Sequence, residues 1–336
     1  MGSTDTSNSV SASSTSATTR SMSTATRKAC SPLTGAQRLR EMLRDPSKVV
    51  VCPGVFDGLT ARLALAAGFD ALYMTGAGTS MSRLGWADLG MATLNDMRAN
   101  AEMIASLDPS VPVIADADTG YGGPIMVTRT VTQYARAGVA ALHIEDQVQE
   151  KRCGHVLGKQ IVERDIFYSR LRVAVTARDN LRSDMLIIAR TDARQTYGFD
   201  EAVARLQEAV RIGVDVVFPE ALQTEAEMVD MCKRVGADTP VLLNVVPGGV
   251  TPECTVEEAR RMGFRVVIYP GLCIGAVVES VARELQTLRT TGMSSSCGTS
   301  SGVSVTIKDA FNLCGLQECI DIDREAGGKA YDTVGR

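Results

Sequence analysis

Short apolar runs alternate with longer amphipathic stretches through most of this 336-residue chain. Each run is continuous, rich in Val and Ile, and followed by glycine or charged residues. Runs of this kind are typical of parallel strands that are buried on both faces. We predict eight such strands, at residues 49–52, 71–74, 111–115, 140–143, 185–189, 214–218, 241–244 and 265–269.

The stretches between these runs have helical spacing. Leu59, Leu63 and Ala66 share one helix face before Gly68, and residues 202–210 and 256–262 repeat the pattern before another glycine. Glycine is favoured at a left-handed helix end. Eight strand–helix units in about 250 residues predict an α/β fold of the (β/α)8 TIM barrel type, with an open doubly wound sheet as the alternative. In a barrel, the chemistry should lie just after each strand.

The two ends of the chain differ from the barrel in composition. Residues 1–33 are Ser/Thr-rich and poor in apolar side chains, so we predict a disordered tail. The tail is also acid-poor, as in mitochondrial transit peptides, but it lacks their apolar face. We therefore predict a cytoplasmic protein, with a mitochondrial location as the alternative. The barrel should span 34–292, a linker 293–304 and a C-terminal helical extension 305–336.

Composition narrows the classes of partner. The content of 45% hydrophobic residues suits a large core, and the net charge of -4 comes without a basic stripe, so we expect no nucleic-acid partner. We expect no membrane span either, because no apolar run approaches the ~20 residues that one needs. Nine scattered cysteines suit a reducing compartment rather than a disulfide framework.

Polar residues follow the predicted strands, where a barrel would hold its site. Asp116 and Asp118 stand at i and i+2 after the third strand, so their carboxylates should point to the same side and face one hard cation such as Mg²⁺ or Mn²⁺. Small residues whose amides can approach an anion follow the second strand. The other candidates at strand ends are Thr75, Gly76, Ala77, Asp88, Glu145, Arg190, Glu220, Asn244 and Thr251.

The segment after the fourth strand carries a cysteine between cations. Cys153 follows Lys151 and Arg152 and precedes Gly154 and His155. Nearby positive charge favours a thiolate, so Cys153 is a candidate acid, base or nucleophile. A basic surface loop that merely contains a cysteine is the alternative.

Three motifs resemble the isocitrate lyase/phosphoenolpyruvate mutase superfamily, over about residues 39–288. They are Asp116-Ala117-Asp118-Thr119-Gly120-Tyr121-Gly122, His143-Ile144-Glu145-Asp146-Gln147 and Lys151-Arg152-Cys153-Gly154-His155. The cysteine motif is similar to that of the carbon–carbon lyases, including 2,3-dimethylmalate and 2-methylisocitrate lyases, and of the fungal oxaloacetate hydrolases. The phosphonomutases lack this cysteine.

The resemblance implies a barrel with a swapped eighth helix, a homotetramer and Mg²⁺ or Mn²⁺. It implies that Asp88, Asp116 and Asp118 surround the metal with support from Glu145. Cys153 would be the general acid, and Arg190, Glu145 and His155 would join it among the catalytic residues. The remaining residues would bind a small dicarboxylate substrate; they are Tyr73, Thr75, Gly76, Ala77, Gly154, Glu220, Asn244 and Thr251.

Two departures from the methylisocitrate lyases bear on the substrate. Pro247 stands where those enzymes have an acid, and Val156 where they have an arginine. Both changes predict a substrate with fewer charged groups, a dicarboxylate of four to six carbons. We expect a lyase that cleaves a substituted malate. The alternative is a hydrolase that converts oxaloacetate to oxalate and acetate, although such enzymes favour serine at the position of Thr251. A non-catalytic binding barrel is a third interpretation.

Overall fold

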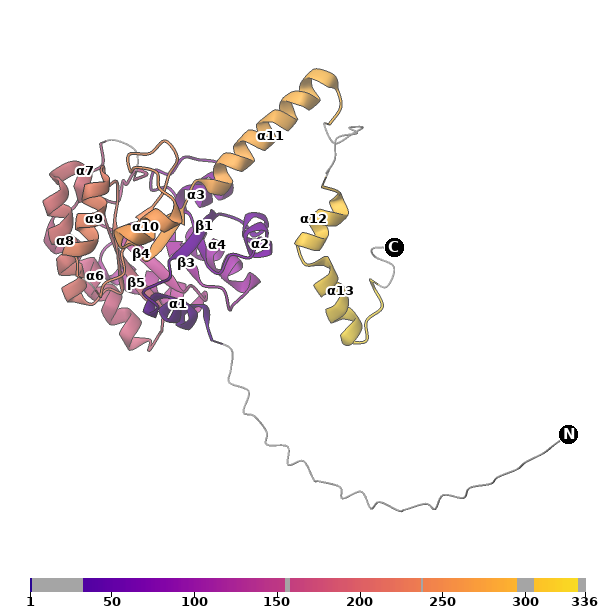
Figure 1. The fold of residues 1–336 in the computed structure, drawn as a ribbon, viewed down its shortest axis with the longest axis horizontal. Coiled ribbons are helices and arrows are strands. Elements are labelled where there is room, and N and C mark those ends of the chain that lie inside the picture. Colours follow the sequence, from indigo (N-terminus) through magenta and orange to yellow (C-terminus); the bar gives the residue numbers. More distant parts are fainter. Residues whose placement is uncertain (2–32, 155–157, 237, 295–304, 332–336) are drawn as a thin grey trace, which may run out of the picture. The chain divides into compact units, whose positions relative to one another are not determined.

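The computed structural model describes residue 1 and residues 33–154, 158–236, 238–294 and 305–331. Eight parallel strands form a ring at the centre of the barrel (Figure 1). Their order in the sheet is β6-β5-β4-β3-β2-β1-β8-β7. The strands are β1 (Val50–Val55), β2 (Leu72–Met74), β3 (Val113–Asp116), β4 (Ala141–Glu145), β5 (Leu186–Thr191), β6 (Val216–Pro219), β7 (Leu242–Asn244) and β8 (Val266–Tyr269).

All eight predicted strands are present, and the ring closes. The edge strands β6 and β7 are joined by a parallel bridge between Val217 and Val241, where the Val217 amide donates to the Pro240 carbonyl at 3.1 Å. The open-sheet alternative is therefore wrong, and the predicted TIM barrel is confirmed.

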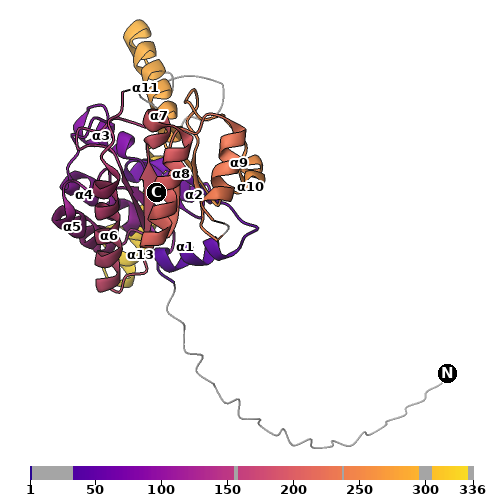
Figure 2. The ribbon, with the colours of Figure 1, turned by 90° about the vertical axis from the view of Figure 1, so that its left-hand side faces the viewer.

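Helices surround the ring (Figures 1 and 2). Their apolar faces pack against the outward side chains of the strands, as at Leu142 and Ile144 of β4. The helices of the barrel are α1 (Gly35–Arg44), α2 (Gly58–Ala66), α3 (Gly76–Leu84), α4 (Leu94–Leu107), α5 (Pro124–Arg136), α6 (Arg164–Asn180), α7 (Ala193–Tyr197), α8 (Phe199–Ile212), α9 (Glu225–Arg234) and α10 (Val256–Met262).

A second apolar cluster fills the inside of the ring. Cys52, Ile114 and Ile188 point inward from their strands, and Leu39 of α1 packs against the same cluster. Because side chains alternate along a strand, the inward positions beyond this cluster lie at the carboxyl end of the ring. This alternation determines which polar residues face the site.

The helix face that contains Leu59 and Leu63 is exposed. These two side chains of α2 are 50% and 51% accessible, whereas the buried residues of α2 are Thr60, Ala61 and Ala64. The predicted helix is therefore confirmed, but the apolar face indicated by its spacing does not cover the barrel.

Three helices follow β8. They are α11 (Leu272–Thr291), α12 (Ile307–Leu313) and α13 (Leu316–Glu325). The long helix α11 has no buried residue, and its apolar side chains at Val278, Val281 and Leu285 are exposed. The division of the chain into tail, barrel, linker and extension stays a prediction, because residues 2–32 and 295–304 lie outside the described part.

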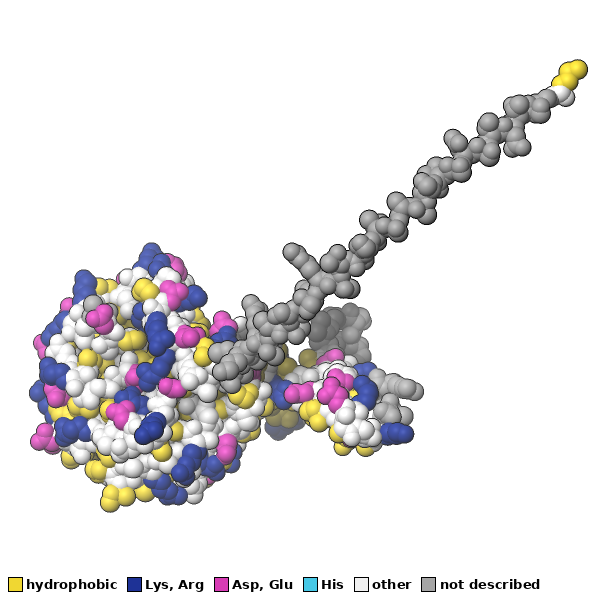
Figure 3. All heavy atoms as spheres, turned by 90° about the horizontal axis from the view of Figure 1, so that it is seen from below, with side chains coloured by type: hydrophobic (Ala, Val, Ile, Leu, Met, Phe, Trp, Pro, Cys, Tyr) yellow, Lys and Arg dark blue, Asp and Glu magenta, His cyan; other side chains and the backbone are white. Residues whose placement is uncertain are grey.

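The barrel surface mixes both signs of charge. Figure 3 shows basic and acidic side chains interspersed over the face in view. Among the described helices, none has the length and apolarity that crossing a membrane requires. The cytoplasmic location stays a prediction.

Candidate active site

A cavity of about 200 Å³ lies at the carboxyl ends of the strands. Side chains reach it from β2, β3, β5 and β7 and from the segment after β4, as expected for a barrel site. Its lining consists of Tyr73, Thr75, Ala77, Met81, Asp88, Asp116, Cys153, Gly154, Arg190, Glu220, Asn244, Val246, Pro270, Gly271 and Ile274.

Most of the residues predicted from the sequence therefore meet at one cavity. Four others are buried but are not part of its lining, namely Gly76, Asp118, Glu145 and Thr251. His155 lies outside the described residues, as does Val156.

A turn at the end of β3 brings Asp116 and Asp118 together. Strand β3 ends at Asp116, and Asp118 has a φ of 47°, so the two do not occupy alternate positions of one strand as predicted. Instead the Asp118 amide donates to Asp116 Oδ1 at 2.8 Å. Their proximity was predicted from the sequence, but the reason for it was wrong.

Lys151 bridges two of the carboxylates predicted to hold a metal. Its Nζ lies 2.6 Å from Asp88 Oδ1 and 2.6 Å from Asp118 Oδ1, and its side chain is buried. Burial and the nearby charges of Asp116 and Asp88 raise the pKa of Asp118 to about 7, although Lys151 opposes this shift. In the part of the chain that the structure describes, no three His, Cys, Asp or Glu side chains converge into a preformed metal site.

A neutral histidine lies behind Tyr73, one of the residues that line the cavity. His143 faces inward from β4, and its Nε2 lies 2.9 Å from the Tyr73 hydroxyl and 3.6 Å from Asp116 Oδ1. Burial lowers the pKa of His143 to about 4, so the ring is uncharged near neutral pH. His143 can therefore orient the Tyr73 hydroxyl. Its place two residues before Glu145, on the same strand face, is the signal that would have identified it.

Arg190 is a buried cation of the cavity lining. Its Nε lies 2.9 Å from Asp192 Oδ2 and 3.1 Å from Glu145 Oε2, and its Nη2 lies 3.4 Å from Glu220 Oε2. The guanidinium also lies 5.1 Å from the centre of the Phe218 ring. These contacts fix Arg190 in a single buried orientation.

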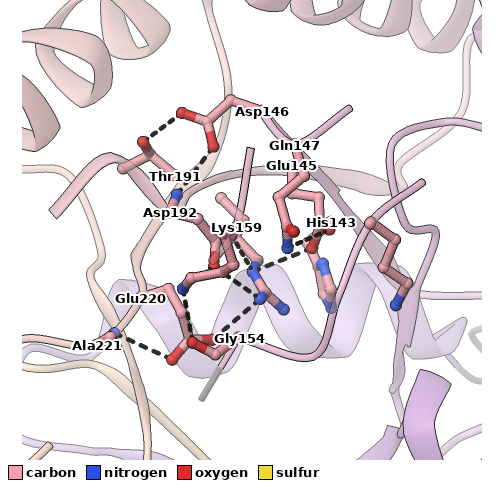
Figure 4. A network of polar contacts seen from close by, with 12 residues as sticks. His143, Glu145, Asp146, Gln147, Gly154, Lys159, Thr191, Asp192, Glu220 and Ala221 are labelled. Carbon is pink, nitrogen blue, oxygen red and sulfur yellow. Dashed lines mark hydrogen bonds and ion pairs between the residues drawn. The ribbon is translucent and has the colours of Figure 1, made fainter. Parts of the chain in front are cut away.

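Glu220 links this cation to the end of β7. The Asn244 Nδ2 donates to Glu220 Oε2 at 3.1 Å, and the Ala221 amide donates to Glu220 Oε1 at 3.0 Å. Figure 4 shows the carboxylates of this side grouped around the end of β5. Glu220 and Asn244 therefore lie together at the cavity wall.

The segment with Cys153 is held at the residues on both sides of the cysteine, Arg152 and Gly154. The Gln147 side chain accepts from the Arg152 amide at 3.1 Å and donates to the Arg152 carbonyl at 2.9 Å. At Gly154, an added Cβ would lie 2.5 Å from Arg190 Nη2 and 2.7 Å from Glu220 Oε2. Only glycine allows this close approach, and the neighbouring Cys153 lines the same cavity as Arg190.

The apolar part of the lining was not predicted. Met81, Val246, Pro270 and Ile274 form it, and nothing in the sequence distinguishes them from core residues. Pro247 is exposed and is not part of the lining, whereas its neighbour Val246 lines the cavity.

Comparison with known proteins places the chain in a family. The phosphoenolpyruvate phosphomutase family profile matches residues 39–289. A 2,3-dimethylmalate lyase of Eubacterium barkeri is 39% identical over 293 residues, which are 86% of this chain and 96% of that protein.

Solved structures agree. A crystal structure of 2,3-dimethylmalate lyase matches with a TM-score of 0.86 and 50% identity, over 90% of this chain and 98% of that one. An oxaloacetate acetylhydrolase with the inhibitor 3,3-difluorooxalacetate matches with a TM-score of 0.85 and 47% identity, over 89% and 99%. A phosphonopyruvate hydrolase with oxalate and Mg²⁺ matches with a TM-score of 0.75 and 26% identity, over 87% of this chain and 99% of that one. The chain belongs to the isocitrate lyase/phosphoenolpyruvate mutase superfamily.

Proposed function

We propose that the protein is a divalent-metal-dependent carbon–carbon lyase that cleaves a small 2-hydroxy dicarboxylate of the substituted malate type. The observation that carries this proposal is the composition of the cavity. Asp88, Asp116, Arg190 and Cys153 all line it. A site with carboxylates for a metal, a fixed cation and a thiol suits an acidic substrate that must be protonated after cleavage.

We propose that Asp88, Asp116 and Asp118 hold Mg²⁺ or Mn²⁺, with Glu145 in support. The donor set fits such an ion, because hard divalent cations take carboxylate oxygens and because Lys151 already bridges two of these groups as a cation. When bound, the ion supplies positive charge to the α-keto acid part of the substrate. The oxalate and Mg²⁺ in the phosphonopyruvate hydrolase structure support this assignment.

The chain's own residues would bind the substrate and deliver a proton. Arg190 would bind a substrate carboxylate, together with Tyr73 and the backbone amides at Thr75, Gly76 and Ala77. Cleavage breaks the bond between C2 and C3, and its electron pair stays on C3 as an enolate. The C2 hydroxyl gives its proton to solvent, and the resulting alkoxide becomes the ketone of the keto acid. The Cys153 thiol then gives its proton to C3, and the thiolate recovers one from solvent.

The apolar wall favours a substituted malate over oxaloacetate. Met81, Val246 and Ile274 offer contacts to alkyl groups, which oxaloacetate lacks. Burial of a methyl or methylene group contributes about 0.8 kcal/mol. The alternative is an oxaloacetate hydrolase that gives oxalate and acetate, and the 47% identity to an oxaloacetate acetylhydrolase supports it. The interpretation as a non-catalytic barrel has no support among these relatives, which are named as enzymes.

Product analysis tests this assignment. The protein is incubated with Mn²⁺ or Mg²⁺ and either a 2,3-dimethylmalate mixture or oxaloacetate. We expect pyruvate and propionate from the first substrate. Oxalate and acetate from the second, with no cleavage of the first, would show a hydrolase instead.

We also propose a homotetramer in which α11 packs on a second copy as a swapped eighth helix. The exposed apolar side chains of α11 and the exposed Leu59 and Leu63 of α2 would then be covered. Light scattering of Val281→Glu beside the wild type tests this: the variant should form smaller assemblies. A wild-type monomer would contradict it.

A further inference from the structure

Lys159 is a buried lysine that the proposed chemistry does not use. Its side chain has no exposed surface, and its Nζ lies 2.5 Å from Asp192 Oδ1. The same ammonium donates to the Gly154 carbonyl at 2.6 Å. Figure 4 shows Lys159 between these two partners. Because a buried charge is costly unless it is paired, this contact needs Asp192 in place.

Asp192 receives both cations of this side of the site. Besides Lys159, it accepts from Arg190 Nε at 2.9 Å and from Arg190 Nη2 at 3.2 Å. Its own amide donates to Asp146 Oδ1 at 2.9 Å, which fixes the carboxylate at the end of β5. Lys159 and Arg190 are therefore held by one anchored group.

Gly154 is held from two directions. Its Cα side lies against Arg190 and Glu220, where a Cβ would not fit, and its carbonyl accepts from Lys159. Cys153 directly precedes this residue. The position of the thiol relative to Arg190 thus depends on the contact between Lys159 and Gly154.

We propose that Lys159 is a positioning residue: through Asp192 and the Gly154 carbonyl it sets the place of the Cys153 thiol relative to the Arg190 guanidinium. This inference rests on the proposed function, in which both groups act on one substrate. Lys159 is not part of the cavity lining, so it acts through its neighbours. A misplacement of about 1 Å can cost a reaction roughly 10²-fold in rate.

Three variants separate the parts of the contact. Lys159→Met removes the charge and the donor, Lys159→Gln keeps a donor without charge, and Lys159→Arg keeps both. Lys48→Met is the matched control, since Lys48 is an exposed lysine whose ammonium lies 3.6 Å from Asp45. The first readout is alkylation of Cys153 by iodoacetamide across pH, followed by peptide mass spectrometry.

The plateau of the alkylation rate at high pH measures access to the thiol. The pH at which the rate is half of this plateau (the midpoint) measures the charge around the thiol. We expect Lys159→Met to raise the plateau roughly tenfold, because a hydrogen bond to a charged group is lost. We expect kcat to fall roughly 10²-fold with a smaller change in KM. In Lys159→Arg, the plateau and kcat should lie closer to the wild-type values. In Lys48→Met, neither the plateau nor kcat should change.

A folded Lys159→Met protein whose plateau stays within about twofold of the wild type would overturn the proposal. So would a change confined to the midpoint, because Lys159 would then act only through its charge. If Lys159→Met does not fold, Lys159→Gln takes its place, because its uncharged side chain is one bond shorter and cannot span both Asp192 and the Gly154 carbonyl. A plateau for Lys159→Gln equal to the wild type then overturns the proposal, and a raised plateau supports it. Alkylation needs no substrate, so this result stands even if the proposed lyase activity fails.

Discussion

Lys151 and Lys159 lie on either side of Cys153 in the chain, and both are buried, but their partners differ. Lys151 contacts two carboxylates, Asp88 and Asp118, which come from different segments. Lys159 contacts one carboxylate that already pairs with Arg190, and one backbone carbonyl. Lys151 therefore bridges two acids, whereas Lys159 adds a second cation to an acid that already pairs with Arg190.

The charge balance of the two groups explains the difference. Around Lys151, the three carboxylates of Asp88, Asp116 and Asp118 lie near one ammonium. Around Lys159, two cations, Lys159 and Arg190, meet the carboxylates of Asp192, Glu220 and Glu145, and burial raises the pKa of Glu145. The group around Lys151 therefore has the larger excess of carboxylates over cations, and it is the group that favours binding of a further cation.

The largest expected effect comes from filling the space at Gly154. Gly154→Ala would place a methyl group against Arg190 and Glu220, and it would push Cys153 away from the cavity. We expect turnover to fall by more than ~10²-fold. Gly123→Ala is the control, because an added Cβ there meets nothing within 4 Å. Steady-state rates of both variants check this, and near-normal turnover of Gly154→Ala would contradict it.

Loss of Arg190 should destabilise the protein, unlike loss of an acid from the other group. Arg190→Met leaves Asp192, Glu145 and Glu220 with one cation fewer, at a cost of about 3–5 kcal/mol. Asp88→Asn should leave the metal-free protein as stable as before or more so, because it removes one of several like charges. Thermal unfolding of the metal-free proteins compares the two. An equal loss of stability in Arg190→Met and Asp88→Asn would show that the two groups do not differ in this way.

Loss of Lys151 should strengthen metal binding. A divalent ion at Asp88 and Asp118 must displace the ammonium, so Lys151→Met should bind Mn²⁺ roughly tenfold more tightly, a change of about 1.4 kcal/mol. Calorimetry measures the affinity, and the single tryptophan, Trp86, lies two residues from Asp88 as a fluorescent reporter. Weaker binding by Lys151→Met would show that the lysine does not compete with the metal.

The smallest expected effect concerns the apolar wall. Val246→Ala should lower kcat/KM for 2,3-dimethylmalate by roughly three- to tenfold, because it removes part of the surface that would contact an alkyl group. Its effect on malate without methyl groups should be smaller. Equal effects on both substrates would mean that Val246 does not select the substituents.

The sequence predicts the frame of this molecule better than its contacts. Eight continuous apolar runs indicate eight buried strands, and the strand ends indicate Asp116, Arg190 and Asn244 as neighbours. Periodicity does not say what covers a helix face, so the exposure of Leu59 and Leu63 was not predicted. It also does not reveal the turn at Asp118, since a positive φ depends on the local backbone. Nor could it tell that Lys151 and Lys159 are buried, because lysines usually lie at the surface.

Turnover by Cys153→Ser tests the central claim most directly. Cys153 lies at the cavity as the proposed general acid, so the variant should bind Mn²⁺ and substrate as the wild type does. Its release of keto acid should fall by roughly 10²- to 10⁴-fold, the usual contribution of a positioned acid. Cys232→Ser, a cysteine outside the cavity lining, is the control and should keep full turnover. If Cys153→Ser keeps more than about a tenth of the wild-type rate, the proton comes from another group and the account is wrong.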